Sequence, residues 1–473
     1  MNMSEAKPRF LGTTLLYFTG TVLAKAAVFL LLPLYTAKIP AAELGSMDVH
    51  VAVAVFAASV ILLDMGVAIL RFYLQAEGER AQHTVLTTGL CLLGMLALLY
   101  LLLALVLSLL YSPRHFWLAV LYGLSNTLLL AAGHVARAVG ARVRYVLSGL
   151  VAALLQVALA LLLVLLLDMG VRGLYLAYIV GALCGCLVAF SAPALRRAPR
   201  MAKADGKLLG VMLRFALPLG ASAAAFLMLS SLSRIVTFYW LGSAAAGHLA
   251  VALKFSQIIL LVSACFQLVW QELALAGTIG KENIVYFTAR ADLFLRVALV
   301  LLLLLIPCTS LFLTLFPRFL GAEYEAVRGL LPAAFLFFAF QVMATFFEPI
   351  LAKYGKTGSL LLTTLAGALL HMLLTALVLL LGGGAVWLLA AAAFSFLAVL
   401  LLRILLLIKG GVLLPSLWRH LLLLLPLGAV VAVYYLLAPV WQAVTLTLMC
   451  LFAMAVLLPE ALLLITRLFN HKK

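Results

Sequence analysis

Apolar stretches of roughly 20 residues or more follow one another along almost the whole chain, separated by short segments that hold charged residues, proline or glycine. About 20 consecutive apolar residues make a helix long enough to cross the hydrocarbon core of a bilayer. The pattern therefore predicts an all-α integral membrane protein. We expect fourteen transmembrane helices, at residues 12–34, 47–70, 84–110, 116–136, 145–167, 173–192, 211–232, 245–270, 291–316, 329–350, 358–381, 385–408, 417–437 and 441–466.

The composition supports this interpretation, because 67% of the 473 residues are apolar, only 10% are charged and the mean hydropathy is +1.26. Soluble domains hold about 45–50% apolar and about 25% charged residues, so no sizeable water-soluble domain is expected. The first apolar stretch is longer than the apolar region of a signal peptide, about 7–15 residues, and it contains Lys25. We expect it to be a retained transmembrane helix.

The 32 lysines and arginines outnumber the 15 acidic residues and are unevenly distributed along the chain. If the N-terminus lies inside, 24 of them fall in segments assigned to the cytoplasm and six in outer segments, while Lys25 and Lys254 lie within spans. An excess of basic residues in cytoplasmic loops orients membrane proteins, so both termini are expected in the cytoplasm. Since the basic residues lie at span ends rather than in one dense patch, a nucleic-acid partner is not expected.

The six cysteines all lie in apolar stretches, without a CxxC pair or a histidine cluster at metal-ligand spacing. No disulfide framework, metal or other cofactor is therefore expected. The chain also lacks the G-x-x-x-x-G-K-[ST] loop that cradles nucleotide phosphates, which argues against ATP-driven transport within it.

A basic segment at residues 193–207, after the sixth predicted span, is interpreted as a linker between two halves. Residues 39–45, after the first span, resemble residues 241–247, after the seventh. The aligned residues are identical at two positions, Ala42 with Ala244 and Gly45 with Gly247. Six spans are an even number, so the two halves would have the same orientation, related by an axis along the membrane normal.

This repeat predicts three parts: an N-terminal lobe at 1–200, a C-terminal lobe at 201–410 and an extra pair of helices with a basic tail at 411–473. The two lobes are expected to face a central cavity.

Two stretches of the chain resemble the bacterial polysaccharide flippases, the exporters of O-antigen and capsule repeat units in the MOP (multidrug/oligosaccharidyl-lipid/polysaccharide) superfamily. The matching segments are residues 25–36, 43–45, 63–66 and 71–73 in the first half, and residues 214–220, 233–234, 241–242, 246–247 and Lys254 in the second. Together the two stretches cover about a quarter of the chain.

The resemblance implies a V-shaped two-lobe fold that works by alternating access and exports undecaprenyl-diphosphate-linked oligosaccharide units. It also implies the bacterial cytoplasmic (inner) membrane, H⁺ or Na⁺ coupling, contact with membrane lipids, and a monomer that works beside polysaccharide assembly proteins.

Three basic residues are candidates for substrate contact. Lys25 and Lys254 lie deep in their spans and Arg234 lies near the outer end of another. An ionisable side chain near the centre of a bilayer costs about 2.5–3.5 kcal/mol on insertion scales and is therefore a functional candidate. Ammonium and guanidinium groups make charge-assisted hydrogen bonds to phosphate, so we expect these residues to bind an anionic head group. The alternative for each is an ion pair, or a side chain that extends to the interface.

Asp64, Arg71 and Glu348 are candidates for coupling or gating. Asp64 lies in the second predicted span, where it would take up a proton or pair with a lysine during switching, or else form an interfacial pair with Arg71. Glu348 lies near a cytoplasmic end, where an interfacial position is the alternative.

Competing functions remain open at this point. A multidrug or cation antiporter of the same superfamily would centre its cavity on a carboxylate, whereas the deepest charges here are lysines. A peptidoglycan-precursor flippase is a further alternative. A membrane glycosyltransferase or polymerase would need catalytic groups in a sizeable outer loop, and the only acidic pair expected outside is Glu323 and Glu325. A transporter rather than an enzyme is therefore predicted.

Overall fold

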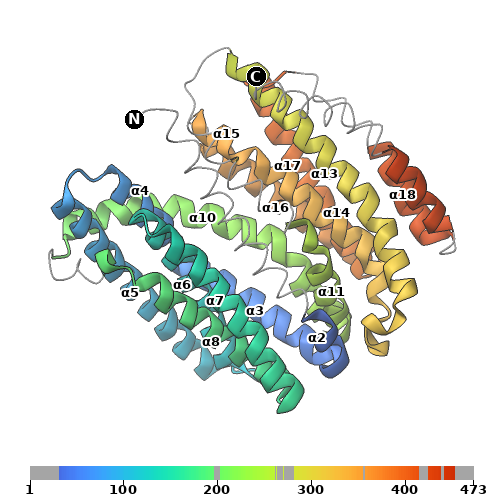
Figure 1. Cartoon of the computed structure of the whole chain (residues 1–473), viewed down its shortest axis with the longest axis horizontal. Helices are drawn as coiled ribbons and strands as arrows, with labels where there is room; N and C mark the ends of the chain where they lie inside the picture. The colour runs from blue at the N-terminus through green and yellow to red at the C-terminus, as the bar shows by residue number, and fades with distance from the viewer. Residues whose placement is uncertain are drawn as a thin grey trace, which may run out of the picture. The chain divides into compact units, whose positions relative to one another are not determined.

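The computed structural model describes residues 31–195, 203–260, 263, 270, 282–354, 357–414, 424–437 and 441–452. Helices make up the regular secondary structure of these residues, and no strand occurs among them (Figure 1). Lys25 and most of the first predicted span lie outside the described residues.

Eleven helices in the described part of the chain are long and apolar enough to cross a membrane. They match the second to the twelfth predicted spans one for one, from Ala41–Gln75 to Ala385–Lys409. Two shorter apolar helices, Leu424–Leu436 and Trp441–Phe452, fall within the last two. The predicted fold class, a multi-pass all-α membrane protein, is confirmed.

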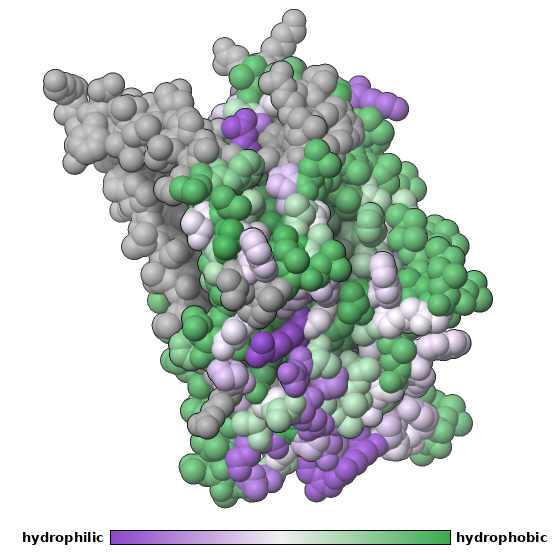
Figure 2. Space-filling model, turned by 90° about the vertical axis from the view of Figure 1, so that its right-hand side faces the viewer, coloured by the Kyte–Doolittle hydropathy of each residue, from purple (hydrophilic) through white to green (hydrophobic). Residues whose placement is uncertain are grey.

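The distribution of hydropathy on the surface agrees with a lipid environment. Figure 2 shows that hydrophobic residues cover much of the described part of this face, and that hydrophilic residues are densest towards its lower edge. In water such a surface would be unfavourable, because soluble monomers rarely expose apolar patches larger than a few hundred Å².

The chain divides into two compact units. Residues 1–254 and 261–269 form the N-terminal unit, and residues 255–260 and 270–473 form the C-terminal unit. The lobe boundaries predicted at residues 200 and 410 remain predictions.

In the N-terminal unit, α6 (Phe116–Ala138) contacts α3 (Ala41–Leu62), α4 (Met65–Gln75), α7 (Arg142–Ala160) and α8 (Gly170–Phe190). α10 (Gly206–Val236) packs on α3, α4 and α5 (Glu79–Leu110). The short α2 (Leu32–Lys38) precedes these helices, and α11 (Ser243–Ser256) follows them.

The second predicted span is broken within the bundle. α3 ends at Leu62 because Leu63 and Asp64 have left-handed backbone conformations, with φ of 53° and 50°. Neither is a glycine, so each conformation stores strain of about 1–3 kcal/mol. α4 resumes at Met65, and the span therefore bends at Asp64.

In the C-terminal unit, neighbouring helices contact one another in the order α18 (Leu424–Leu436), α13 (Glu282–Leu315), α14 (Val327–Phe346), α17 (Ala385–Lys409) and α16 (Thr357–Leu380). The centre is α14, since most of its residues are buried. Trp270 stacks on Phe346 with 4.5 Å between ring centroids, and Phe346 stacks on Phe294 at 4.2 Å.

Candidate functional site

The two similar segments found in the sequence pack against each other within the N-terminal unit. A Cβ atom placed on Gly45 would overlap the carbonyl of Ser243 and the amide of Gly247, and one on Gly247 would overlap the carbonyl of Ala41. Only glycine lets two backbones approach so closely. The start of α3 and the start of α11 therefore meet at a seam, which we call the glycine seam (Gly45, Ser243 and Gly247).

A cluster of charged and aromatic side chains lies at the same end of this unit, which the predicted topology places outside. At a rise of 1.5 Å per residue, Asp48 lies about 10 Å from the start of α3. Arg234 lies about 10 Å from the end of its span at Leu241. Lys254 lies about 16 Å from the start of α11. The three groups thus come from helices of both predicted repeats and lie two to three turns inside those helices.

Asp48 and Arg234 form an ion pair between α3 and α10. The Arg234 Nη1 atom lies 3.4 Å from Asp48 Oδ2 and 3.5 Å from Oδ1, and the two side chains are 21% and 11% exposed. These distances exceed the usual 2.7–2.9 Å of a charge-assisted hydrogen bond. The pair therefore neutralises charge without the tight geometry that would fix both side chains.

Lys254 lies over an aromatic ring. Its Nζ atom is 5.6 Å from the ring centroid of Tyr35, a distance at which a cation is attracted by the π-electrons. Tyr35 is buried, and its hydroxyl shares a hydrogen bond of 2.7 Å with that of Tyr178 on α8. Among the described residues Lys254 forms no ion pair with an acidic side chain.

Two further tyrosines complete the cluster. The ring of Tyr122 on α6 lies edge-on to those of Tyr175 and Tyr178, with centroids 6.4 and 5.5 Å away. The Tyr175 hydroxyl and the Arg234 Nε atom are buried and have no hydrogen-bond partner within the described part of the chain. Buried polar groups are normally paired, so the cluster has hydrogen-bonding capacity that the protein itself leaves unused. We call these residues the outer cluster: Tyr35, Asp48, Tyr122, Tyr175, Tyr178, Arg234 and Lys254.

Above the cluster, at the start of α6, His115 packs near Tyr175 with ring centroids 6.2 Å apart. Burial, together with the positive charges of Arg114 and Arg172, lowers the pKa of His115 below its ordinary value. This histidine is therefore neutral at physiological pH. It adds no positive charge to this end of the unit.

The predicted coupling residues of the N-terminal unit do not pair with each other. Asp64 lies half-buried at the break between α3 and α4 and forms no ion pair with Arg71. The Arg71 guanidinium lies instead over the ring of Phe215, 4.2 Å from its centroid. Their predicted roles in coupling and gating remain predictions.

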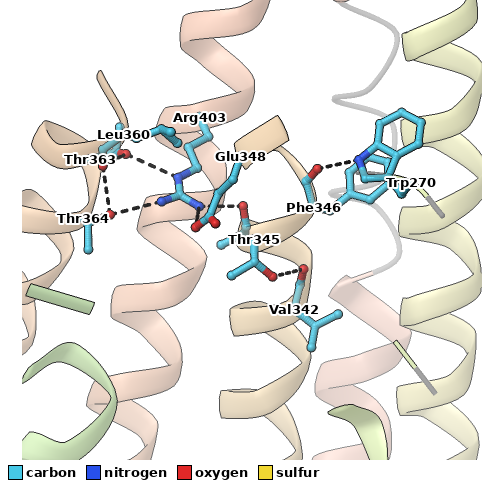
Figure 3. Close-up of polar contacts among 10 residues, drawn as sticks. Trp270, Val342, Thr345, Phe346, Glu348, Leu360, Thr363, Thr364 and Arg403 are labelled. Atoms are coloured by element: carbon cyan, nitrogen blue, oxygen red, sulfur yellow. Dashed lines mark hydrogen bonds and ion pairs between the residues drawn. The ribbon is translucent and has the colours of Figure 1, made fainter. Parts of the chain in front are cut away.

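Glu348 belongs to a different network, in the C-terminal unit (Figure 3). The Arg403 side chain on α17 is 2% exposed, and its Nη1 atom donates to Glu348 Oε1 at 2.9 Å and to the Ala344 carbonyl at 2.7 Å. Its Nε and Nη2 atoms donate to the hydroxyls of Thr363 and Thr364, at 3.3 and 3.1 Å. We call this set the Arg403 network. It joins the ends of α14, α15 (Glu348–Lys353), α16 and α17.

Sequence reasoning found Lys254, Arg234 and Glu348, but it missed Asp48 and the environment of Arg403. Asp48 lies one residue inside the predicted span 47–70, and the helix begins earlier, at Ala41. Arg403 is one of the 24 basic residues counted with the cytoplasmic segments, and it is buried inside α17. The rule that marks Lys254, an ionisable residue within an apolar run, would have found both.

No family model matches this chain, and no curated protein matches its sequence. Solved structures do. The chain is similar to the lipid II flippase MurJ in an inward closed conformation, with a TM-score of 0.70 and 13% identity over 93% of this chain and 98% of that one.

It is also similar to two further transporter structures. One is a multidrug resistance MATE family transporter of the MOP superfamily in an inward-facing conformation, with a TM-score of 0.55 and 16% identity over 87% of this chain and 95% of that one. The other is a MATE protein in the bent conformation, with a TM-score of 0.52 and 14% identity over 88% and 95%. The chain thus has the fold of MOP-superfamily transporters and flippases, and none of these neighbours is an enzyme.

Proposed function

We propose that this protein is a flippase that moves undecaprenyl-diphosphate-linked oligosaccharide units from the cytoplasmic to the outer leaflet of the bacterial inner membrane by alternating access. The observation that carries the proposal is the charge balance of the outer cluster. It holds two cations, Arg234 and Lys254, and one carboxylate, Asp48, which pairs with Arg234. The Lys254 amine is left to bind an anion, and a diphosphate is such an anion.

The aromatic part of the outer cluster suits the sugar part of this cargo. The hydroxyl of Tyr175 and the Nε atom of Arg234 are buried donors that have no partner among the described residues, and sugar hydroxyls and phosphate oxygens accept hydrogen bonds from both. Lys25, which lies outside the described residues, would add a further cation.

The glycine seam supplies a site for opening. Gly45 and Gly247 bring backbone against backbone, and this contact carries no interlocking side chains. Separating the two segments would expose the outer cluster to the outer side, and the Asp48–Arg234 pair, whose geometry is loose, would part at the same time. Asp64, at the strained break of the second span, is our candidate for the group whose protonation drives this step.

Two alternatives differ in cargo. A cation antiporter would need an uncompensated carboxylate in the cluster, whereas Asp48 is paired. A peptidoglycan-precursor flippase is favoured by one observation, the TM-score of 0.70 with the lipid II flippase MurJ against 0.55 and 0.52 with the MATE structures. Both lipid-linked cargoes would present a diphosphate to Lys254, so the same site would bind either of them.

The test is the surface polysaccharide of cells that depend on this protein for its export. Replacing Lys25 and Lys254 together with alanine is expected to abolish surface polysaccharide while membrane abundance stays at the wild-type level. A matched variant, Lys38→Ala, removes a cation that is paired with Asp168 near the surface and should export normally. Unchanged surface polysaccharide in the double variant would contradict the proposal.

A further inference from the structure

The Asp48 carboxylate is held by a single group of the outer cluster. Its two oxygens share one donor, the Arg234 Nη1 atom, at 3.5 and 3.4 Å, and no other hydrogen bond to this carboxylate occurs among the described residues. An ionised carboxylate has about four lone-pair positions that can accept hydrogen bonds. Since the Asp48 side chain is only 11% exposed, water has little access to the positions that Arg234 leaves unused.

The Arg234 guanidinium is under-used in the same way. A strong arginine–carboxylate pair has two nitrogens, each of which donates to one oxygen. Here one nitrogen serves both oxygens, and the Nε atom is buried without a partner in the described part of the chain. An anion that reached Arg234 would therefore find donors that Asp48 does not occupy.

The surrounding tyrosines do not fix the carboxylate either. Tyr122 on α6 and Tyr175 on α8 lie close enough to Asp48 to interact with its charge, and Tyr122 also interacts with the charge of Arg234. The buried Tyr175 hydroxyl nevertheless has no hydrogen-bond partner among the described residues. Buried ion pairs are stabilised by additional hydrogen bonds to both partners. Without them, the Asp48–Arg234 pair is one that a better anion can break.

Asp48 is an isolated acidic residue among basic ones. The neighbouring helices α6, α8, α10 and α11 contain no acidic residue, and residues 84–110 of α5 and all of η2 (Thr237–Leu241) contain neither an acidic nor a basic one. The other carboxylate at this end of α3, Glu43, lies 3.9 Å from Arg114. Besides Arg234 and the two tyrosines, the titratable groups on α3 and the helices around it at this end are His50, His115, Arg172, Tyr178, His248 and Lys254.

We propose that Asp48 is an internal competitor of the anionic head group, which occupies Arg234 in the cargo-free protein and is displaced from it when a diphosphate binds. The inference rests on the proposed function. A diphosphate carries more charge and more acceptor oxygens than a carboxylate, so it can accept from several guanidinium nitrogens at once.

The displaced carboxylate does not stay ionised beside the cargo. A nearby anion of like charge favours the protonated form of a carboxylic acid. A proton from water therefore binds to Asp48 together with the diphosphate, and it returns to water when the cargo leaves and the ion pair re-forms. This proton is separate from the one proposed for Asp64.

The competition limits how tightly the cargo is held. The apparent affinity of a site falls with the fraction of protein in which the site is free, and Asp48 keeps Arg234 occupied. Re-formation of the Asp48–Arg234 pair also assists release of the head group. Asp48 is therefore a positioning residue that acts on the cargo through Arg234, and removing its charge should tighten binding rather than weaken it.

The experiment measures calorimetric binding of inorganic diphosphate to the full-length protein in lipid nanodiscs. Two buffers with different ionisation enthalpies count the protons taken up with each diphosphate. Asp48→Asn removes the charge at nearly constant size, and Asp48→Glu keeps it. Asp168→Asn makes the same change in an exposed pair, 3.3 Å from Lys38, and is the matched control. Thermal unfolding of each variant checks its fold.

We expect Asp48→Asn to bind diphosphate at least about tenfold more tightly than the wild type, equivalent to about 1.4 kcal/mol. The wild type should take up about one proton more per bound diphosphate than Asp48→Asn, so its affinity relative to that variant should fall about tenfold for each unit of rising pH. Asp48→Glu and Asp168→Asn should resemble the wild type in both properties.

Equal or weaker binding by folded Asp48→Asn would overturn the inference, since a residue that only orients Arg234 for the ligand gives that result. If Asp48→Asn does not fold, the infrared difference spectrum of the wild type decides. Diphosphate should then produce the C=O band of a protonated carboxylic acid, and the absence of this band would contradict the exchange. Failure of both the wild type and folded Asp48→Asn to bind diphosphate would instead overturn the proposed function.

Discussion

The C-terminal unit contains a buried arginine and the N-terminal unit a half-buried one, and the two are satisfied to very different degrees. Arg403 makes four hydrogen bonds to four residues, at 2.7–3.3 Å. Arg234 makes one loose ion pair at 3.4 Å, and its Nε atom has no partner within the described part of the chain. Among the described residues, the Lys254 ammonium contacts the ring of Tyr35 and forms no ion pair.

This difference separates a structural role from a binding role. Burying a charge is costly unless it is paired and hydrogen-bonded, so a set of hydrogen bonds from every guanidinium nitrogen indicates an arginine that holds helices together. An incomplete set leaves donors available to a ligand. The Arg403 network therefore stabilises the C-terminal unit, whereas the outer cluster of the N-terminal unit is the site at which we propose that an anion binds.

The largest expected effect concerns the Arg403 network. Arg403→Ala leaves the carbonyl of Ala344 and the carboxylate of Glu348 without their donor, so it should destabilise the protein by about 3–5 kcal/mol. Chemical denaturation in detergent measures this. The exposed pair between Arg114 and Glu43, at 3.9 Å, is the control and should cost less than about 1 kcal/mol. A similar small cost for both would erase the distinction between the two regions.

The glycine seam gives the next largest effect. Gly247→Ala places a methyl group against the Ala41 carbonyl, and overpacking of this kind costs about 1–3 kcal/mol. Gly210→Ala on α10 is the matched control, because its Cβ meets nothing within 4 Å. That control should be neutral or slightly stabilising through helix propensity. Equal stability of the two variants would mean that the seam is not closely packed.

Lys254→Ala should reveal the opposite behaviour to Arg403→Ala. We expect transport to fall at least tenfold, equivalent to about 1.4 kcal/mol, with no loss of stability, since a half-buried ammonium within an apolar helix costs free energy to keep. Lys254→Arg, which keeps the charge, should retain part of the activity. Flipping assays and unfolding curves on the same preparations compare the two properties. Loss of stability without loss of transport would place Lys254 with the structural residues.

The smallest effect concerns the hydrogen bond between Tyr35 and Tyr178. Tyr35→Phe should cost about 1 kcal/mol. Tyr178→Phe removes the same bond, so the double variant should cost less than the sum of the two single ones. Additive costs in this cycle would show that the hydroxyls do not act as a pair.

Hydropathy was sufficient to predict the fold, because the length of each apolar run is fixed by the thickness of the bilayer. The ends of the second to twelfth spans matched within about ten residues. Single buried charges such as Lys254 were also visible, since they interrupt apolar runs.

The pairing of residues was not predictable in the same way. Tyr35 and Tyr178 are separated by 143 residues, and the partners of Arg403 come from three other helices. Hydropathy carries no information about which faces of two helices meet. The break at Leu63 and Asp64 was equally hidden, because neither residue type favours a left-handed conformation strongly enough to signal it.

The most direct test of the central claim, that Lys254 binds an anionic lipid-linked cargo, is translocation by the purified protein in proteoliposomes. Wild-type protein and Lys254→Ala are each supplied with a fluorescent undecaprenyl-diphosphate-linked sugar and, separately, with a cationic dye. The account predicts that the wild type flips the lipid-linked sugar and not the dye, and that Lys254→Ala flips it at least tenfold more slowly. Equal rates for the two proteins, or transport of the dye alone, would contradict it.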